Sequence, residues 1–203
     1  ITNFEGDEGL GLGELSFSPD GKILAFVRGN SRNSAGEAAN PAQLQENTDF
    51  KIHLIDLTTL KTRNFSPGST ITFSPDGQAL VYKIGPNVYW KSLNDSSSQQ
   101  ERLFVSRGGT SQLSFSPDGE KLAFVSTRGD HSFIGIWDFE QKKLTYPETS
   151  LDKDSYPAWS PDGKHLAYLR IPNINNLLSF TAIKESNPWS IRVLDMETMR
   201  AEE

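Results

Sequence analysis

Apolar and polar residues alternate in short runs along this chain, and one recurring phrase separates the runs. The phrase is an aromatic residue, Ser-Pro-Asp-Gly, and an apolar run that ends in a second aromatic residue. It occurs four times, at residues 17–26, 73–82, 115–124 and 159–168. Alternation with a period of two predicts β-strands. A turn phrase between two such runs predicts a tight β-hairpin.

The chemistry of the phrase assigns a structural task to its polar residues. Proline presets the backbone of a type I turn, aspartate can bond backbone amides ahead of it, and glycine takes the positive φ that closes the hairpin. The four copies lie in separate repeats, so we interpret their aspartates as turn residues and not as a ligand set. The predicted structural turn residues are Asp20, Gly21, Asp76, Gly77, Asp118, Gly119, Asp162 and Gly163.

The copies begin 56, 42 and 44 residues apart, a period typical of propeller blades or solenoids. A third strand-like segment follows each copy, at 52–57, 88–93, 133–139 and 189–195, and a weaker fourth follows at 62–65, 101–105 and 143–146. Four antiparallel strands per repeat predict an all-β fold, a β-propeller with about four blades. We place this single domain at 1–203, with blades near 5–66, 67–107, 108–148 and 149–203 and insertions at 30–49 and 173–188.

The two ends of the chain leave the number of blades open. Residues 1–4 read as the outermost strand that precedes a blade, and residues 199–203 lie where the last blade should begin its fourth strand. Either residues 1–4 pair beside 189–195 and close a ring of four, or the chain is a segment of a larger ring. We favour the segment, because no natural start is visible and small rings of such blades are uncommon.

Composition narrows the classes of partner. The chain has 203 residues, a formal net charge of −6, a pI near 5.2 and no cysteine. The acidic balance and the lack of a basic stripe argue against nucleic-acid binding. No apolar run approaches the roughly 18 residues of a membrane span, and the N-terminus lacks the pattern of a signal peptide. We therefore expect neither a nucleic-acid nor a membrane partner.

The repeats resemble the propellers of TolB-like proteins and of the prolyl oligopeptidase family. Residues 126–139, 150–172 and 187–195 look more like the propeller of dipeptidyl-peptidase-type members. The resemblance implies an N-terminal propeller that caps an α/β-hydrolase domain with a Ser-Asp-His triad, limits access to peptides and anchors their amino end. It also favours a periplasmic or secreted location.

The hydrolase signature itself is missing from the sequence. No Gly-x-Ser-x-Gly pentad occurs, and the nearest candidate, residues 109–113, lacks the second glycine. His53, His131 and His165 are assigned to a strand, a loop and a turn boundary, and we expect none of them to be a catalytic base. We predict no catalytic residue, cofactor or metal in this chain.

Two functions remain. The first is a non-catalytic propeller that gates and selects peptides for a serine exopeptidase of the dipeptidyl-peptidase type. The alternative is a stand-alone TolB-like interaction propeller without an enzyme. The expected partners are the missing hydrolase domain and further blades, or a second copy of the chain, with a peptide substrate in the parent enzyme.

Several other candidates are given structural interpretations. Residues 128–130 spell Arg-Gly-Asp in a turn, and sequons at Asn64 and Asn94 matter only in a glycosylating cell. Five acidic residues could offer oxygens to calcium but match no calcium motif, so we interpret them as solvated loops. They are Glu5, Asp7, Glu8, Asp152 and Asp154. Neither insertion contains the adjacent glutamate pair that would hold a substrate's ammonium group, since Glu37, Glu46 and Glu185 stand alone. No substrate-binding residue is assigned.

Overall fold

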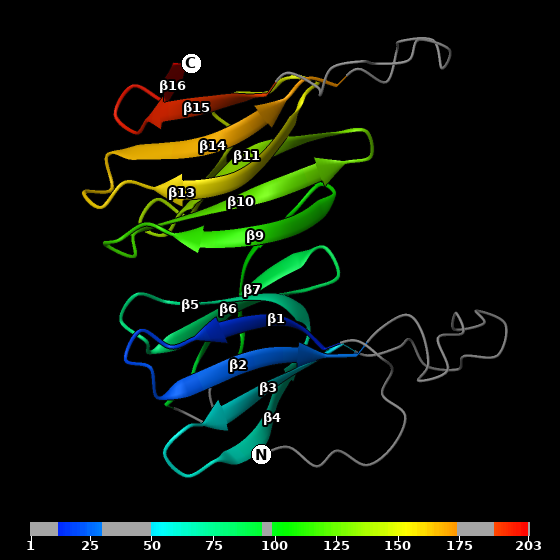
Figure 1. Ribbon diagram of the computed structural model, residues 1–203, viewed down its shortest axis with the longest axis vertical. Helices are drawn as coiled ribbons and strands as arrows, with labels where there is room; N and C mark the ends of the chain where they lie inside the picture. Colours follow the sequence, from blue (N-terminus) through cyan, green and yellow to red (C-terminus); the bar gives the residue numbers. More distant parts are fainter. Residues whose placement is uncertain (1–11, 30–49, 95–98, 174–188, 203) are drawn as a thin grey trace, which may run out of the picture. The chain divides into compact units, whose positions relative to one another are not determined.

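A computed structural model describes residues 12–29, 50–94, 99–173 and 189–202 (Figure 1). Residues 1–4, the acidic group at 5–8, and nearly all of the two predicted insertions lie outside the described residues. The described elements are all β-strands. By compactness the chain divides into unit 1, Ile1–Leu103, and unit 2, Phe104–Glu203, and each is described by itself.

Unit 1 contains two four-stranded antiparallel sheets. Sheet 1 has the order β1-β2-β3-β4, and sheet 2 has the order β5-β6-β7-β8 (Figure 1). The strands of sheet 1 are β1 (Leu12–Phe17), β2 (Ile23–Arg28), β3 (Lys51–Asp56) and β4 (Lys61–Pro67). Those of sheet 2 are β5 (Ser69–Phe73), β6 (Ala79–Ile84), β7 (Asn87–Ser92) and β8 (Glu101–Val105), and the division between the units falls within β8.

Unit 2 repeats the pattern. The strands of sheet 3 are β9 (Gly109–Phe115), β10 (Lys121–Arg128), β11 (His131–Asp138) and β12 (Lys143–Thr145). Those of sheet 4 are β13 (Lys153–Trp159), β14 (His165–Ile171), β15 (Ser190–Asp195) and β16 (Arg200–Glu202). One parallel bridge, between Ser132 of β11 and Lys153 of β13, joins the two sheets. The predicted all-β fold with four-stranded antiparallel sheets is confirmed.

Each sheet has two distinct faces, because side chains alternate along a strand. We call back face the one that carries Ala25 and Val27 in sheet 1, with the cross-strand partners Leu54 and Ile52. We call the opposite face the front face. It carries the aromatic residue that begins each phrase, such as Phe17 in sheet 1. The names apply to the equivalent positions of every sheet.

In each unit the core forms where the back face of one sheet meets the front face of the next. The core of unit 1 consists of Ala25, Val27, Ile52, Leu54, Phe65, Phe73, Leu80 and Tyr82. The core of unit 2 consists of Ala123, Val125, Ile134, Ile136, Leu166, Tyr168 and Leu194, with Trp159 packed against it. Burial of each large apolar side chain stabilises the fold by about 1.5–3 kcal/mol.

The last strand bears on the alternatives for the chain ends. Residues Arg200–Glu202 form β16 and pair antiparallel with β15, with Asp195 opposite Arg200 and Val193 opposite Glu202. β16 therefore lies beside Val193–Asp195, where the sequence predicted that the last blade's fourth strand would begin.

Candidate functional site

The four Ser-Pro-Asp-Gly turns share one hydrogen-bond pattern. The serine hydroxyl donates to the aspartate carboxylate over 2.5–2.7 Å, and the carboxylate accepts the amide two residues further on over 2.9–3.1 Å. The serine oxygen also accepts the amide five residues ahead over 2.9–3.0 Å. The glycines have φ between 69° and 77°.

These contacts account for the side chains of the four aspartates. Hydrogen bonds, the largest of them from the serine hydroxyl, lower the pKa of Asp20, Asp76, Asp118 and Asp162. Each carboxylate is engaged by its own turn. The structural role of Ser18 and its counterparts was missed from the sequence, although the invariance of serine within the four phrases was the available signal.

The three histidines have partners of an ordinary kind. His53 is buried and stacks on Phe26, with ring centroids 5.2 Å apart. His131 is the first residue of β11 and not a loop residue as expected, and its Nδ1 lies 2.7 Å from the carboxylate of Asp130. His165 Nε2 lies 4.0 Å from Asp195 on the back face of sheet 4.

In the Arg-Gly-Asp tripeptide, Arg128 ends β10, and Gly129 and Asp130 form the two-residue turn that leads into β11. Arg128 pairs with His131 across the turn, and Gly129 has φ 76°. The Arg128 guanidinium lies over the rings of Phe133 and Tyr146, at 5.8 and 5.6 Å from their centroids. The arginine is thus engaged by its own sheet.

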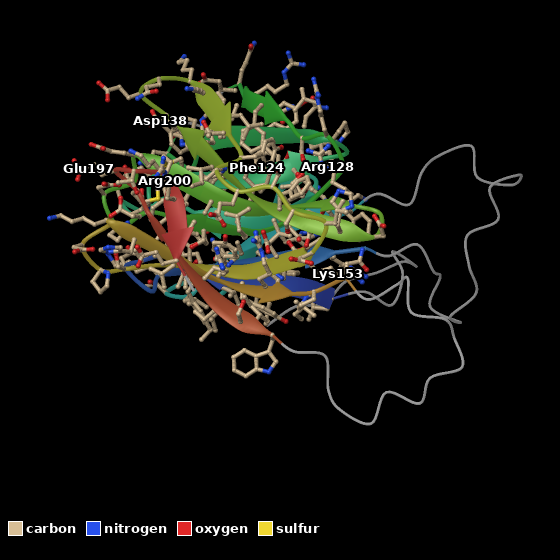
Figure 2. All side chains as sticks on the ribbon, turned by 90° about the horizontal axis from the view of Figure 1, so that it is seen from above. Phe124, Arg128, Asp138, Lys153, Glu197 and Arg200 are labelled. Carbon is tan, nitrogen blue, oxygen red and sulfur yellow. The ribbon has the colours of Figure 1, made fainter. Side chains whose placement is uncertain are left out.

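Figure 2 shows how polar side chains divide between the two ends of unit 2. Arg128 and Lys153 lie at one end of the strands, and Asp138, Glu197 and Arg200 lie at the other, with Phe124 between them (Figure 2). The second end is the one at which the Ser-Pro-Asp-Gly turns connect β9 to β10 and β13 to β14.

Asp154 is not the solvated loop residue that the sequence predicted. It lies in β13, is 1% exposed, and is held by Arg170 through two bonds, Nε to Oδ1 at 2.7 Å and Nη2 to Oδ2 at 2.9 Å. A charge buried this deeply needs a hydrogen-bonded partner. Asp152, by contrast, is half-buried and accepts the amide of Asn173 at 3.2 Å.

The pair extends into a charge cluster, defined as Glu148, Asp154, Tyr168, Arg170 and Arg192. Glu148 Oε2 accepts the Tyr168 hydroxyl at 3.1 Å and lies 3.6 and 3.5 Å from the two arginines. Its other oxygen accepts the amide of Ala201 at 3.1 Å. One carboxylate, from the segment between β12 and β13, therefore ties together β14, β15 and β16.

Burial governs the electrostatics of this cluster. Desolvation raises the pKa of Asp154, with Arg170 acting in the opposite sense, and it also raises the pKa of the Tyr168 phenol to about 12. The bonds to Asp154 raise the pKa of Arg170, so the guanidinium stays charged. Because its two carboxylates and two guanidiniums are already paired with each other, the cluster is suited to holding the strands of sheet 4 together. A sequence signal existed, since Arg170 continues the buried alternation of Leu166 and Tyr168.

A second group of residues recurs at the bulge in the first strand of each sheet. These edge residues all have positive φ, from 49° to 55°, and they are Glu14, Thr70, Gln112 and Tyr156. In unit 1 the Glu14 carboxylate accepts the Ile71 amide at 3.1 Å and the Thr70 hydroxyl at 3.3 Å. In unit 2 Gln112 Oε1 accepts the amide of Tyr156 at 2.5 Å.

Unlike the turn residues, whose polar groups are engaged within their own turns, one of the edge residues has an accessible aromatic side chain. Tyr156 is 70% exposed at a strand edge, although it lies directly beside the bulge of the preceding sheet. An exposed aromatic ring beside polar backbone is a common anchor for peptides. We take Tyr156, with Gln112, as the candidate binding site. Positive φ at non-glycine residues could not be read from the sequence.

Within the described ranges, no three histidine, aspartate or glutamate side chains are grouped so that they could hold a metal ion. A helix with the length and apolar character needed to cross a bilayer is absent from the same residues.

The fold defines the class of this chain: its sheets are those of β-propeller proteins. A TolB structure from Acinetobacter baumannii matches 95% of the chain at 22% identity and a TM-score of 0.62, and the chain covers 43% of that protein. The β-propeller domain of the Trilobed protease from Pyrococcus furiosus matches 94% of the chain at 14% identity and a TM-score of 0.62, with 55% of that chain covered. The tricorn protease matches 91% at 16% identity and a TM-score of 0.60, with 18% covered.

Sequence comparison finds several curated proteins that match. One of them, Protein hir1 of Schizosaccharomyces pombe, is 28% identical over 134 residues, which are 61% of this chain and 13% of that protein. No family model matches the sequence. The chain spans less than two thirds of the proteins it matches. The predicted resemblance to TolB-like and prolyl oligopeptidase-type propellers is confirmed at the level of the fold.

Proposed function

We propose that this chain is a non-catalytic propeller domain that gates substrate access and selects peptides for a serine exopeptidase of the dipeptidyl-peptidase type. The hydrolase domain of that enzyme would lie outside this chain. The observation that carries the proposal is the exposed Tyr156 on the edge of β13, next to Gln112 of the preceding sheet.

Three further observations support it. Residues 126–139, 150–172 and 187–195 resemble dipeptidyl-peptidase-type propellers, and peptidase propellers share the fold. The polar residues of the repeats are engaged in turns, and those of the charge cluster in ion pairs, so both serve the scaffold. A rigid scaffold with an accessible aromatic edge is suited to positioning a peptide for chemistry performed elsewhere.

The test uses the full-length gene product and chromogenic X-Pro and X-Ala substrates, with and without a serine-directed inhibitor. We expect inhibitor-sensitive release. Tyr156→Ala should raise KM by roughly tenfold with kcat unchanged, because it removes binding that is uniform along the reaction. Leu151→Ala, at a residue 75% exposed in the neighbouring loop, is the matched control and should leave both constants unchanged.

A stand-alone interaction propeller is the second candidate, favoured by the TolB match over 95% of the chain. Absence of serine-dependent release from the full-length product would reject the peptidase proposal. The second candidate would be supported if the full-length product formed a stable complex with a protein partner and Tyr156→Ala weakened that complex.

A further inference from the structure

Arg128, the last residue of β10, is a half-buried cation whose N–H donors have no acceptor in the described part of the chain. The rings of Phe133 and Tyr146 engage the faces of its guanidinium but accept no hydrogen bond from its edge. Of its three guanidinium nitrogens only Nε is buried. A guanidinium stays charged in proteins, so the compensation that the described residues do not supply is left to solvent or to a ligand.

The Arg128 side chain is nevertheless held in position. Its guanidinium carbon lies 5.8 Å from the centroid of the Phe133 ring and 5.6 Å from that of Tyr146. Gly108 lies against its stem, since a Cβ there would collide with the Thr127 carbonyl oxygen and lie 3.1 Å from Arg128 Cδ. A guanidinium supported in this way presents a planar fork of donors that matches a carboxylate.

Arg170 shows how the same unit satisfies such a guanidinium. It also lies over a tyrosine ring, with 5.6 Å between its guanidinium carbon and the centroid of Tyr168. Its donors are taken by Asp154 through two hydrogen bonds, and Glu148 lies 3.6 Å away. Arg128 has the same kind of ring contact without the carboxylate. We therefore expect its missing partner to have the chemistry of Asp154.

The surroundings of Arg128 favour an anion. Arg107, which precedes the glycine just described, and Lys153, the first residue of β13, are both exposed, and neither forms an ion pair with a described residue. Figure 2 shows Arg128 and Lys153 at the same end of the strands. The acid of the adjoining turn, Asp130, is occupied, because its carboxylate lies 2.7 Å from His131 Nδ1. This end of unit 2 should attract anions although the chain carries a net charge of −6.

We infer that Arg128 binds the carboxylate of a peptide, either its C-terminus or an aspartate or glutamate side chain. The terminal nitrogens Nη1 and Nη2 would donate to its oxygens, while Phe133 and Tyr146 hold the guanidinium. Lys153 lies three residues along β13 from Tyr156, so an extended peptide on the Tyr156 edge can bring a carboxylate to this end within a few residues. The inference names the peptides that would be selected, and in that part it rests on the proposed function.

Matched pairs of pentapeptides test the inference by isothermal titration calorimetry on the full chain. The first pair shares one sequence and differs in a free or amidated C-terminus. The second pair is amidated in both members and differs in an internal glutamate or glutamine. We expect the member with the carboxylate to bind at least about tenfold more tightly in one or both pairs, and the pair that shows the preference identifies the source. Added salt should reduce the preference.

Three variants assign the preference to the fork of donors. Arg128→Gln should abolish it, and Arg128→Lys, which keeps the charge but not the planar fork, should retain only part of it. Arg63→Gln is the matched control, because Arg63 is an exposed arginine whose guanidinium carbon lies 5.7 Å from the centroid of the Phe65 ring. It should leave the preference unchanged. Far-ultraviolet circular dichroism checks that each variant keeps the β-sheet spectrum of the parent.

N-acetylglutamate separates this inference from the proposed function, because it carries carboxylates without a peptide chain. Its binding is followed by the NMR signal of the Arg128 Nε–H group, assigned with Arg128→Lys. A shift of this signal without binding of any pentapeptide would establish the carboxylate site and reject peptide binding at Tyr156. Equal affinities within both pairs, or a preference that survives Arg128→Gln, would overturn the inference and leave the Tyr156 site standing. Neither a shift nor a preference would overturn it as well.

Discussion

The two units differ in the residue that lies across the sheet from the last aromatic residue of each Ser-Pro-Asp-Gly phrase. The aromatic residue that ends each phrase lies on the second strand, opposite a residue of the third strand. In unit 1 that opposite residue is a ring: His53 lies 5.2 Å from Phe26, and Tyr89 lies 6.1 Å from Tyr82, between ring centroids.

In unit 2 the opposite residues are Gly135 and Arg192. The ring of Phe124 covers Gly135 so closely that a Cβ there would contact it, and Tyr168 donates to Glu148 of the charge cluster. The phrase therefore determines the turn and the strand that follows it. The residue across the sheet determines what the aromatic ring packs against, which is another ring in unit 1 and either glycine backbone or the charge cluster in unit 2.

The largest expected difference between the units concerns buried charge. Asp154→Ala leaves Arg170 without its bidentate partner and should lower the free energy of unfolding by about 3–5 kcal/mol. Gln100→Ala in unit 1 removes a neutral acceptor from Tyr82, at 2.8 Å, and should cost about 1 kcal/mol. Urea unfolding followed by tryptophan fluorescence measures both. For Asp154→Ala, a Trp90→Phe parent restricts the signal to the three tryptophans of unit 2, whereas Gln100→Ala is measured with Trp90 of unit 1 in place.

A double variant distinguishes the contribution of the Asp154–Arg170 charges from the contribution of the volume that the two side chains fill. Asp154→Leu combined with Arg170→Met should recover most of the stability lost in Asp154→Ala, because a buried pair is often replaceable by apolar residues of similar volume. If Asp154→Ala unfolded no more easily than Gln100→Ala, the contrast between charged and neutral faces would be wrong.

Next in size is the effect of a side chain at Gly135. Gly135→Ala places a methyl group against the Phe124 ring and should destabilise unit 2 by about 1–3 kcal/mol through overpacking. Gly13→Ala in β1 is the matched control, since a Cβ there meets nothing within 4 Å, and should change stability by less than about 0.5 kcal/mol. Equal midpoints for the two variants in urea would show that Phe124 moves aside without cost.

The sequence predicted what is local and missed what is long-range. The four phrases predicted the turns and the first hairpin of each sheet, because proline, aspartate and glycine act within a few residues. The strand-like segments that follow each phrase predicted the remaining strands. The pairing of Asp154 with Arg170 joins residues from two strands, so its burial could not be deduced from a loop-like acidic segment. The bulge at Tyr156 was equally hidden, because its positive φ belongs to a residue type that rarely adopts it.

The turn serines should show no difference between the units. Ser74→Ala and Ser116→Ala each remove a hydroxyl that donates to the turn aspartate and accepts a strand amide. We expect a loss of about 1 kcal/mol in both, measured by urea unfolding with the tryptophans of the affected unit. A loss confined to one unit would mean that the phrase depends on its sheet, contrary to the identical bond pattern.

The last expected effect is absent at neutral pH, appears only at alkaline pH and distinguishes Tyr168 from Tyr82. Burial raises the pKa of both phenols, that of Tyr168 to about 12. A folded-state pKa above the unfolded value of about 10 means that the stabilisation is complete below pH 10 and is lost as the pH rises through about 12. Rapid-mixing absorbance at 295 nm should therefore show a phenolate step near pH 12 that Tyr168→Phe abolishes. Tyr82→Phe should leave this step in place, because the Glu148 carboxylate and buried Asp154 oppose ionisation only in unit 2. Ionisation of Tyr168 near pH 10 would show that its ring is solvated and that the charge cluster does not enclose it.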